Sequence, residues 1–221
     1  MKKIHVVLVC ICFTFIISGC TNQTIESIGE PPIKMRSITL KDPNLDTSYH
    51  LSIPEDWIAG MSGSHHIAAG FSDMTIDLAN FKSYLHITNY LDSAQSEEGQ
   101  QAYQGLFQGK YDEFETWMNK QFRIGDFLLP FDYQKEYSDF HYKIYQGSHG
   151  KIMEVKCQET YKDQSQESIS HVLYYYREDI PYVVSVILDT SYVFSQPSAI
   201  HEFTSEEVAL WVADSLTIEE L

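Results

Sequence analysis

Four segments rich in aromatic and β-branched residues follow one another in the second half of the chain, and they constrain the fold most. They span residues 140–145, 151–161, 169–176 and 182–188. Such residues favour β-strands because their side chains pack well on a pleated, half-buried surface. The short polar segment 177–181 joins the last two and predicts a hairpin of central strands. The pattern therefore predicts a sheet with antiparallel neighbours.

The first half adds shorter strand signals. The alternating runs 37–40 and 49–53 predict an antiparallel pair, and 84–90 predicts a further strand. Residues 58–73 are rich in glycine and serine, which predicts a loop, with one short strand as the alternative.

Two helices complete the prediction. An apolar stripe at helical spacing predicts one helix that ends near Gly125, and Thr204 with Glu207 forms a capping box that opens a second helix. The sequence thus predicts an α+β domain: an antiparallel β-sheet of about six strands flanked by helices, including a C-terminal helix. The stripe consists of Phe107, Tyr111, Phe114, Met118 and Phe122.

The N-terminus carries a targeting signal. Lys2 and Lys3 precede an apolar run over residues 4–17, which is too short to cross a bilayer core of ~30 Å as a helix. The run ends in an aliphatic residue and two small residues, followed by Cys20.

This ending, Ile17, Ser18, Gly19 and Cys20, resembles the lipobox of bacterial lipoproteins. The resemblance implies that residues 1–19 are a signal peptide, that cleavage occurs before Cys20, and that a diacylglyceryl thioether forms on its sulfur. Two acyl chains anchor a protein stably where one does not. We therefore expect a lipid-anchored protein at the cell membrane with its domain on the extracytoplasmic side.

The processed chain is then divided simply. Residues 20–35 are expected to form a tether, and residues 36–221 a single domain. The net charge is −16, and it becomes −18 once the two lysines of the signal peptide are removed. Such acidity argues against nucleic acid as a partner, because that requires a basic surface.

Only Cys20 and Cys157 remain after processing, so no intramolecular disulfide is expected. Cys157 shares a predicted strand face with Met153 and Val155, which indicates a buried structural thiol instead of a nucleophile.

The order of elements resembles the PsbP-like fold group, which includes DcrB-type bacterial lipoproteins. The resemblance covers roughly residues 36–217 and depends on the segment Ile-Pro-Glu-Asp-Trp at 53–57, the late hairpin, and a final helix ending at 213–216. It implies an antiparallel sheet flanked by helices, and it implies no catalytic residue.

Motifs for catalysis or cofactors are missing from the sequence: it has no G-x-S-x-G, H-E-x-x-H, phosphate loop, dinucleotide fingerprint or EF-hand. No cofactor is therefore predicted. His65 and His66 are weak candidates for a metal site, because adjacent residues can share one ion only in a loop. The acidic segment 92–98 could hold calcium weakly, although solvated acid is the expected state.

These observations favour a non-enzymatic, membrane-anchored lipoprotein that binds an envelope protein or component. One alternative is a metal- or small-ligand-binding module that uses the 60–73 loop. Another is an enzyme whose catalytic residues are dispersed along the sequence.

Overall fold

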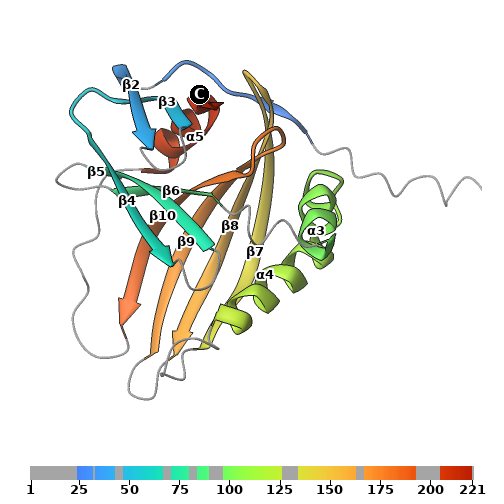
Figure 1. Cartoon of the computed structure of the whole chain (residues 1–221). Helices are drawn as coiled ribbons and strands as arrows, with labels where there is room; N and C mark the ends of the chain where they lie inside the picture. Colours follow the sequence, from blue (N-terminus) through green and yellow to red (C-terminus); the bar gives the residue numbers. More distant parts are fainter. Residues whose placement is uncertain are drawn as a thin grey trace, which may run out of the picture.

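The computed structural model is an α+β fold, and it describes residues 24–31, 33–42, 47–66, 71–79, 84–89, 97–125, 134–162, 167–192 and 205–220 (Figure 1). The helices are α3 (Glu97–Phe107), α4 (Tyr111–Gly125) and α5 (Ser205–Ser215). The strands are β1 (Glu26–Ser27), β2 (Met35–Asp42), β3 (Thr47–Pro54), β4 (Ile58–His66), β5 (Phe71–Ala79), β6 (Tyr84–Asn89), β7 (Gln134–Gly147), β8 (Gly150–Lys162), β9 (Glu167–Arg177), β10 (Tyr182–Tyr192) and β11 (Thr217–Glu220).

The strands of the described chain form two sheets. The larger has eight strands in the order β1-β7-β8-β9-β10-β6-β5-β4, and the smaller has three in the order β11-β3-β2. All neighbours are antiparallel except β1 and β7, which are parallel. The predicted count of about six strands is therefore too low.

Four strands were not predicted, namely β1, β4, β5 and β11, and of these β4 and β5 occupy most of the segment 58–73 that is predicted to be a loop. They pair antiparallel from Ile58 opposite Ala79 to His66 opposite Phe71. Glycine and serine are uncommon in strands, because glycine has no side chain to pack and loses more entropy on ordering. The composition of 58–73 therefore gives little strand signal, and the strands are stabilised by the pairing of β5 with β4 and β6.

The other strand predictions are confirmed. The runs 37–40 and 49–53 lie in β2 and β3, and 84–90 corresponds to β6. The four aromatic segments lie in β7 to β10. Of the predicted connection 177–181, the first residue ends β9 and 178–181 form the turn of the β9–β10 hairpin.

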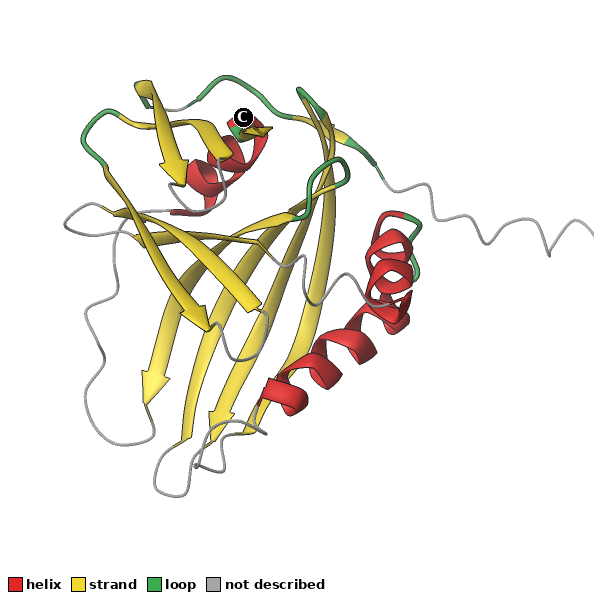
Figure 2. Ribbon diagram, in the orientation of Figure 1, coloured by secondary structure: helices red, strands yellow, loops and turns green. Residues whose placement is uncertain are grey.

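Each face of the large sheet carries its own apolar core, and each is covered by different elements. On one face, α5 contacts β3, β9 and β10, so that α5 and the small sheet form the cover (Figure 2). Tyr49 of β3 reaches Tyr182 of β10, with 3.0 Å between the hydroxyl oxygens. On the other face, α3 packs on β8 and α4 on β7.

The C-terminal end of α5 is fixed by a buried arginine. The guanidinium of Arg177 donates to the carbonyl oxygens of Ala213 and Leu216, and it also forms an ion pair with Asp179. A cation at this position satisfies free carbonyl groups and the negative end of the helix dipole. Arg177 thereby joins the end of β9 to the end of α5.

The single helix predicted over the apolar stripe is in fact two helices. At the end of α3, Lys110 N donates to Gly105 O at 2.8 Å and Gly109 N donates to Leu106 O at 3.4 Å. Gly109 has φ of 78°, in the left-handed region that glycine tolerates. This is a Schellman motif, which ends α3 before α4 begins.

Part of the segment predicted as a tether belongs to the fold. Glu26 and Ser27 form β1, which pairs with Tyr145 and Gln146 of β7. Ile28 and Ile33 then pack against the apolar core that also contains α5.

Candidate functional site

The second helix, α4, separates a buried face from a polar one. Phe114, Trp117 and Met118 point into the core and are at most 5% exposed. The polar face bounds an open cavity of about 580 Å³. The described residues that line it follow helical spacing: Asp112, Glu115, Thr116, Asn119 and Lys120.

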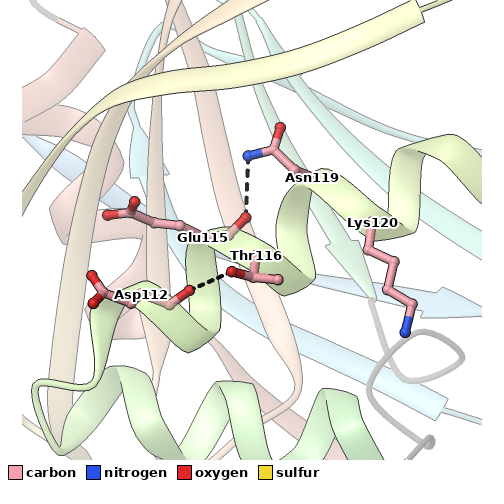
Figure 3. A pocket seen from close by; sticks show the side chains of 5 residues that line it. All are labelled: Asp112, Glu115, Thr116, Asn119 and Lys120. Carbon is pink, nitrogen blue, oxygen red and sulfur yellow. Dashed lines mark hydrogen bonds between the residues drawn. The ribbon is translucent and has the colours of Figure 1, made fainter.

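The charged groups of this wall point in different directions. Figure 3 shows the carboxylates of Asp112 and Glu115 on the same side of the helix, whereas the Lys120 chain extends the other way. Lys120 forms an ion pair with Glu98 of α3 at 2.6 Å. The side that carries the two carboxylates is therefore acidic.

Asn119 ties α4 to the sheet and fixes the position of the cavity. Its Oδ1 accepts from Tyr137 N at 2.8 Å, and its Nδ2 donates to Tyr137 O and Glu115 O, each at 3.1 Å. One side chain thus satisfies both backbone groups of a residue on β7. The cavity wall is held by a rigid contact between a helix and a strand.

A bulge in β7 brings two tyrosines to the same side of this strand. The register with β8 shifts between Ser138 and His141, and Asp139 has φ of 54°. A bulge inserts an extra residue and changes which side chains share a face. Tyr137 and Tyr142 accordingly both pack with the core under α3 and α4.

Tyr142 contacts Glu115 of the cavity wall. Its hydroxyl donates to Glu115 Oε1 at 2.9 Å, and its ring stacks on Tyr111 with 3.8 Å between centroids and 5° between planes. The ring of Phe140 is parallel to it at 6.2 Å. Burial, reinforced by Glu115, raises the pKa of Tyr142, so its hydroxyl stays protonated and acts as a donor.

A hydrogen-bonded chain of polar groups lies deeper, below α4. Tyr174 donates to Tyr137 over 3.4 Å, Tyr137 donates to Glu159 over 2.9 Å, and Lys135 contacts the same carboxylate at 2.8 Å. Burial is the main cause of the raised pKa of Tyr137 and of Tyr174. Because Lys135 neutralises Glu159, the chain satisfies buried groups and does not present a free base.

A second tyrosine–carboxylate contact lies on the opposite face of the sheet. The hydroxyls of Tyr145 and Tyr175 both donate to Glu154 Oε2, at 3.0 and 2.9 Å. Tyr175 also reaches Glu206 O of α5 at 3.2 Å. This group connects the first turn of α5 to the sheet, which is a structural role.

Cys157 has the buried environment that the sequence predicted. The residue is 1% exposed, and burial raises the pKa of its thiol to about 12, with Glu159 as the second cause. Because a thiolate is the reactive form, this cysteine is a poor nucleophile at neutral pH.

The other candidates from the sequence are not brought together. Cys20 lies outside the described residues. His65 and His66 are successive residues of β4, so the loop that a shared metal ion required is not present. Within the segment 92–98, Glu97 and Glu98 form the first turn of α3 instead of a loop. Among the described residues, no group of three or more histidine, cysteine or acidic side chains could hold a metal ion.

Sequence reasoning missed the cavity wall. Its signal was the spacing of Asp112, Glu115, Thr116 and Asn119, which places polar residues on one helical face. A polar helical face is usually only solvated, so the cavity and the contact of Asn119 with Tyr137 appear only in the folded structure.

Comparison with known proteins leaves the family open. No protein-family model, no curated protein and no solved structure matches the chain. Within the described part of the chain, no helix has the length and apolar character needed to cross a membrane. The PsbP-like resemblance stays a prediction.

Proposed function

We propose that this protein is a lipid-anchored, non-enzymatic binding domain that recognises a protein of the cell envelope. Cys20 carries the anchor, and the polar face of α4 is the recognition surface. The single observation that carries the second part is the open cavity of about 580 Å³ along α4.

The chemistry of the cavity supports binding of a protein surface. Small-molecule sites are mostly apolar and enclosed, with few polar groups. Here the described wall presents carboxylates, a hydroxyl, an amide and an ammonium group. Asn119 and Glu115 are already engaged in holding α4 and Tyr142, so they serve the scaffold. Asp112, which is exposed, remains for a basic side chain of a partner.

The lipid anchor is tested by acylation in cells. The change Cys20→Ala removes the thiol, so labelling with a fatty-acid probe should be lost and the signal peptide should be retained. Labelling and gel mobility of the wild type and the variant measure both effects. Undiminished labelling of the variant would refute the anchor.

The recognition surface is tested with matched charge reversals. Asp112→Lys changes the cavity wall, whereas Glu113→Lys makes the same change on an exposed neighbour that does not line the cavity. In membranes that contain the anchored protein, cross-linking to its partner should fall about tenfold for Asp112→Lys, the loss expected for removing ~1.4 kcal/mol of binding. Equal cross-linking by both variants would exclude the α4 face.

A further inference from the structure

Strand β1 attaches the N-terminal part of the described chain to the outer edge of the large sheet. Glu26 and Ser27 pair in parallel with Tyr145 and Gln146. The carboxylate of Glu26 also contacts Lys143 Nζ at 2.8 Å, and the same ammonium lies 4.8 Å from the ring centroid of Tyr145. Backbone pairing and an ion pair therefore both hold Glu26 against β7.

Apolar contacts extend this attachment toward β2. Ile28 and Ile33 are partly buried against the core that contains α5, whereas Ile25, just before β1, is 47% exposed. The domain therefore begins at Glu26, well before the boundary at residue 36 that composition predicts.

The attachment limits how far the domain can move from Cys20. Only six residue steps separate Cys20 from Glu26, whereas fifteen separate it from Met35, where β2 begins. Since a chain spans at most ~3.6 Å per residue in any conformation, these limits are ~20 Å and ~50 Å. Pairing of β1 with β7 thus shortens the maximum reach about 2.5-fold.

We infer that β1 is a clip that holds the domain next to the membrane, and that the partner is therefore another protein of the same membrane. This inference rests on the proposed lipid anchor at Cys20.

The same geometry limits the distance between the recognition surface and the bilayer. Asn119 contacts Tyr137, eight residues from Tyr145 along β7, or about 26 Å at the usual rise of a strand. The α4 cavity then lies within ~50 Å of the bilayer surface while the clip is closed.

A pair of isoleucine variants tests the clip on the intact chain. Ile28→Asp places a charge against the core and should release β1, whereas Ile25→Asp adds the same charge at an exposed position. Hydrogen exchange of the amides of 26–28 should accelerate at least tenfold in the first variant and stay unchanged in the second. Unprotected exchange of these amides in the wild type would overturn the clip.

The reach is tested on vesicles of phosphatidylethanolamine and phosphatidylglycerol that carry the acylated full-length protein. A donor dye on Ser138→Cys, an exposed position of β7, reports energy transfer to acceptor lipids. Transfer should fall for Ile28→Asp, because the next apolar contact along the chain is at Ile33 and the maximum reach from Cys20 then rises about twofold. It should not change for Ile25→Asp. Equal transfer from both variants would overturn the inference.

The two arms separate the clip from the anchor. If Cys20 carries no lipid, none of the proteins will attach to vesicles, and the proposed anchor fails. The exchange measurement still decides whether β1 is bound, because it does not depend on a membrane. Unchanged exchange at amides of β8 and β9 will show that Ile28→Asp leaves the fold intact.

Discussion

At the scale of single residues, the contact between Asp214 and the β7–β8 turn leaves no room for a side chain at position 147. The carboxylate of Asp214 accepts from Ser148 N at 2.6 Å and from Ser148 Oγ at 2.7 Å. A Cβ on the neighbouring Gly147 would lie 2.4 Å from Asp214 Oδ1 and 2.9 Å from Ile152 Cδ1. Helix α5 therefore approaches this turn as closely as it does because position 147 has no side chain.

This close approach predicts a large effect of one methyl group. Gly147→Ala should lower the free energy of unfolding by about 1–3 kcal/mol, the usual cost of overpacking a buried contact. Gly60→Ala is the matched control, since nothing lies within 4 Å of a Cβ at that position of β4. Urea unfolding of the two variants measures the difference. Equal stability of Gly147→Ala and the wild type would show that Asp214 can move away at little cost.

At the scale of elements, α4 depends on one polar side chain for its attachment to β7. Asn119 satisfies both backbone groups of Tyr137 where the bulge interrupts the ladder with β8. Lys120 is next to it in sequence but makes only an exposed ion pair with Glu98, each side chain being 52% exposed. The two neighbours should therefore differ sharply in their effect on stability.

Asn119→Ala should lower the free energy of unfolding by about 1–3 kcal/mol, because it removes the hydrogen bonds that join α4 to the backbone N and O of Tyr137. Lys120→Ala should cost less than about 1 kcal/mol, the range of surface ion pairs. Chemical denaturation measures both values, and hydrogen exchange of the Tyr137 amide reports the local contact. A larger loss from Lys120→Ala than from Asn119→Ala would contradict this account of α4.

The sequence predicts elements well where side-chain type and environment agree. Strands β7 to β10 are rich in aromatic and β-branched residues, so their existence could be read directly. Phe107 and Tyr111 are four residues apart, which is the spacing of one continuous helix. The sequence therefore predicted one helix, although Gly109 separates α3 from α4. The role of Asn119 could not be predicted, because it depends on a strand that starts only at Gln134.

At the scale of the whole molecule, many phenol groups are held in their neutral form. Burial is the leading cause of the raised pKa of each of these tyrosines. At all of them except Tyr176, a nearby carboxylate raises the pKa further. These tyrosines lie on both faces of the large sheet: Tyr137, Tyr142, Tyr174, Tyr175 and Tyr176.

This pattern predicts loss of stability at alkaline pH. In the unfolded chain, Cys157 ionises near pH 9 and the tyrosines near pH 10, whereas the folded chain keeps these protons. The contribution of these groups to stability is therefore constant below about pH 9 and falls above it, by up to ~1.4 kcal/mol per pH unit for each group that ionises only on unfolding. Urea unfolding at rising pH and fixed ionic strength measures the slope. Constant stability up to about pH 11 would show that these groups ionise freely in the folded protein.

The position of β11 has a consequence for the order in which this protein can mature. Strand β3 lies between β2 and β11, and the core around Tyr49 also contains residues of α5. This core therefore joins early and late segments, and contacts between distant segments slow folding. The small sheet and the core around Tyr49 cannot be completed until α5 and β11 have been synthesised. Truncation before β11 should therefore leave one edge of β3 unpaired and open to aggregation.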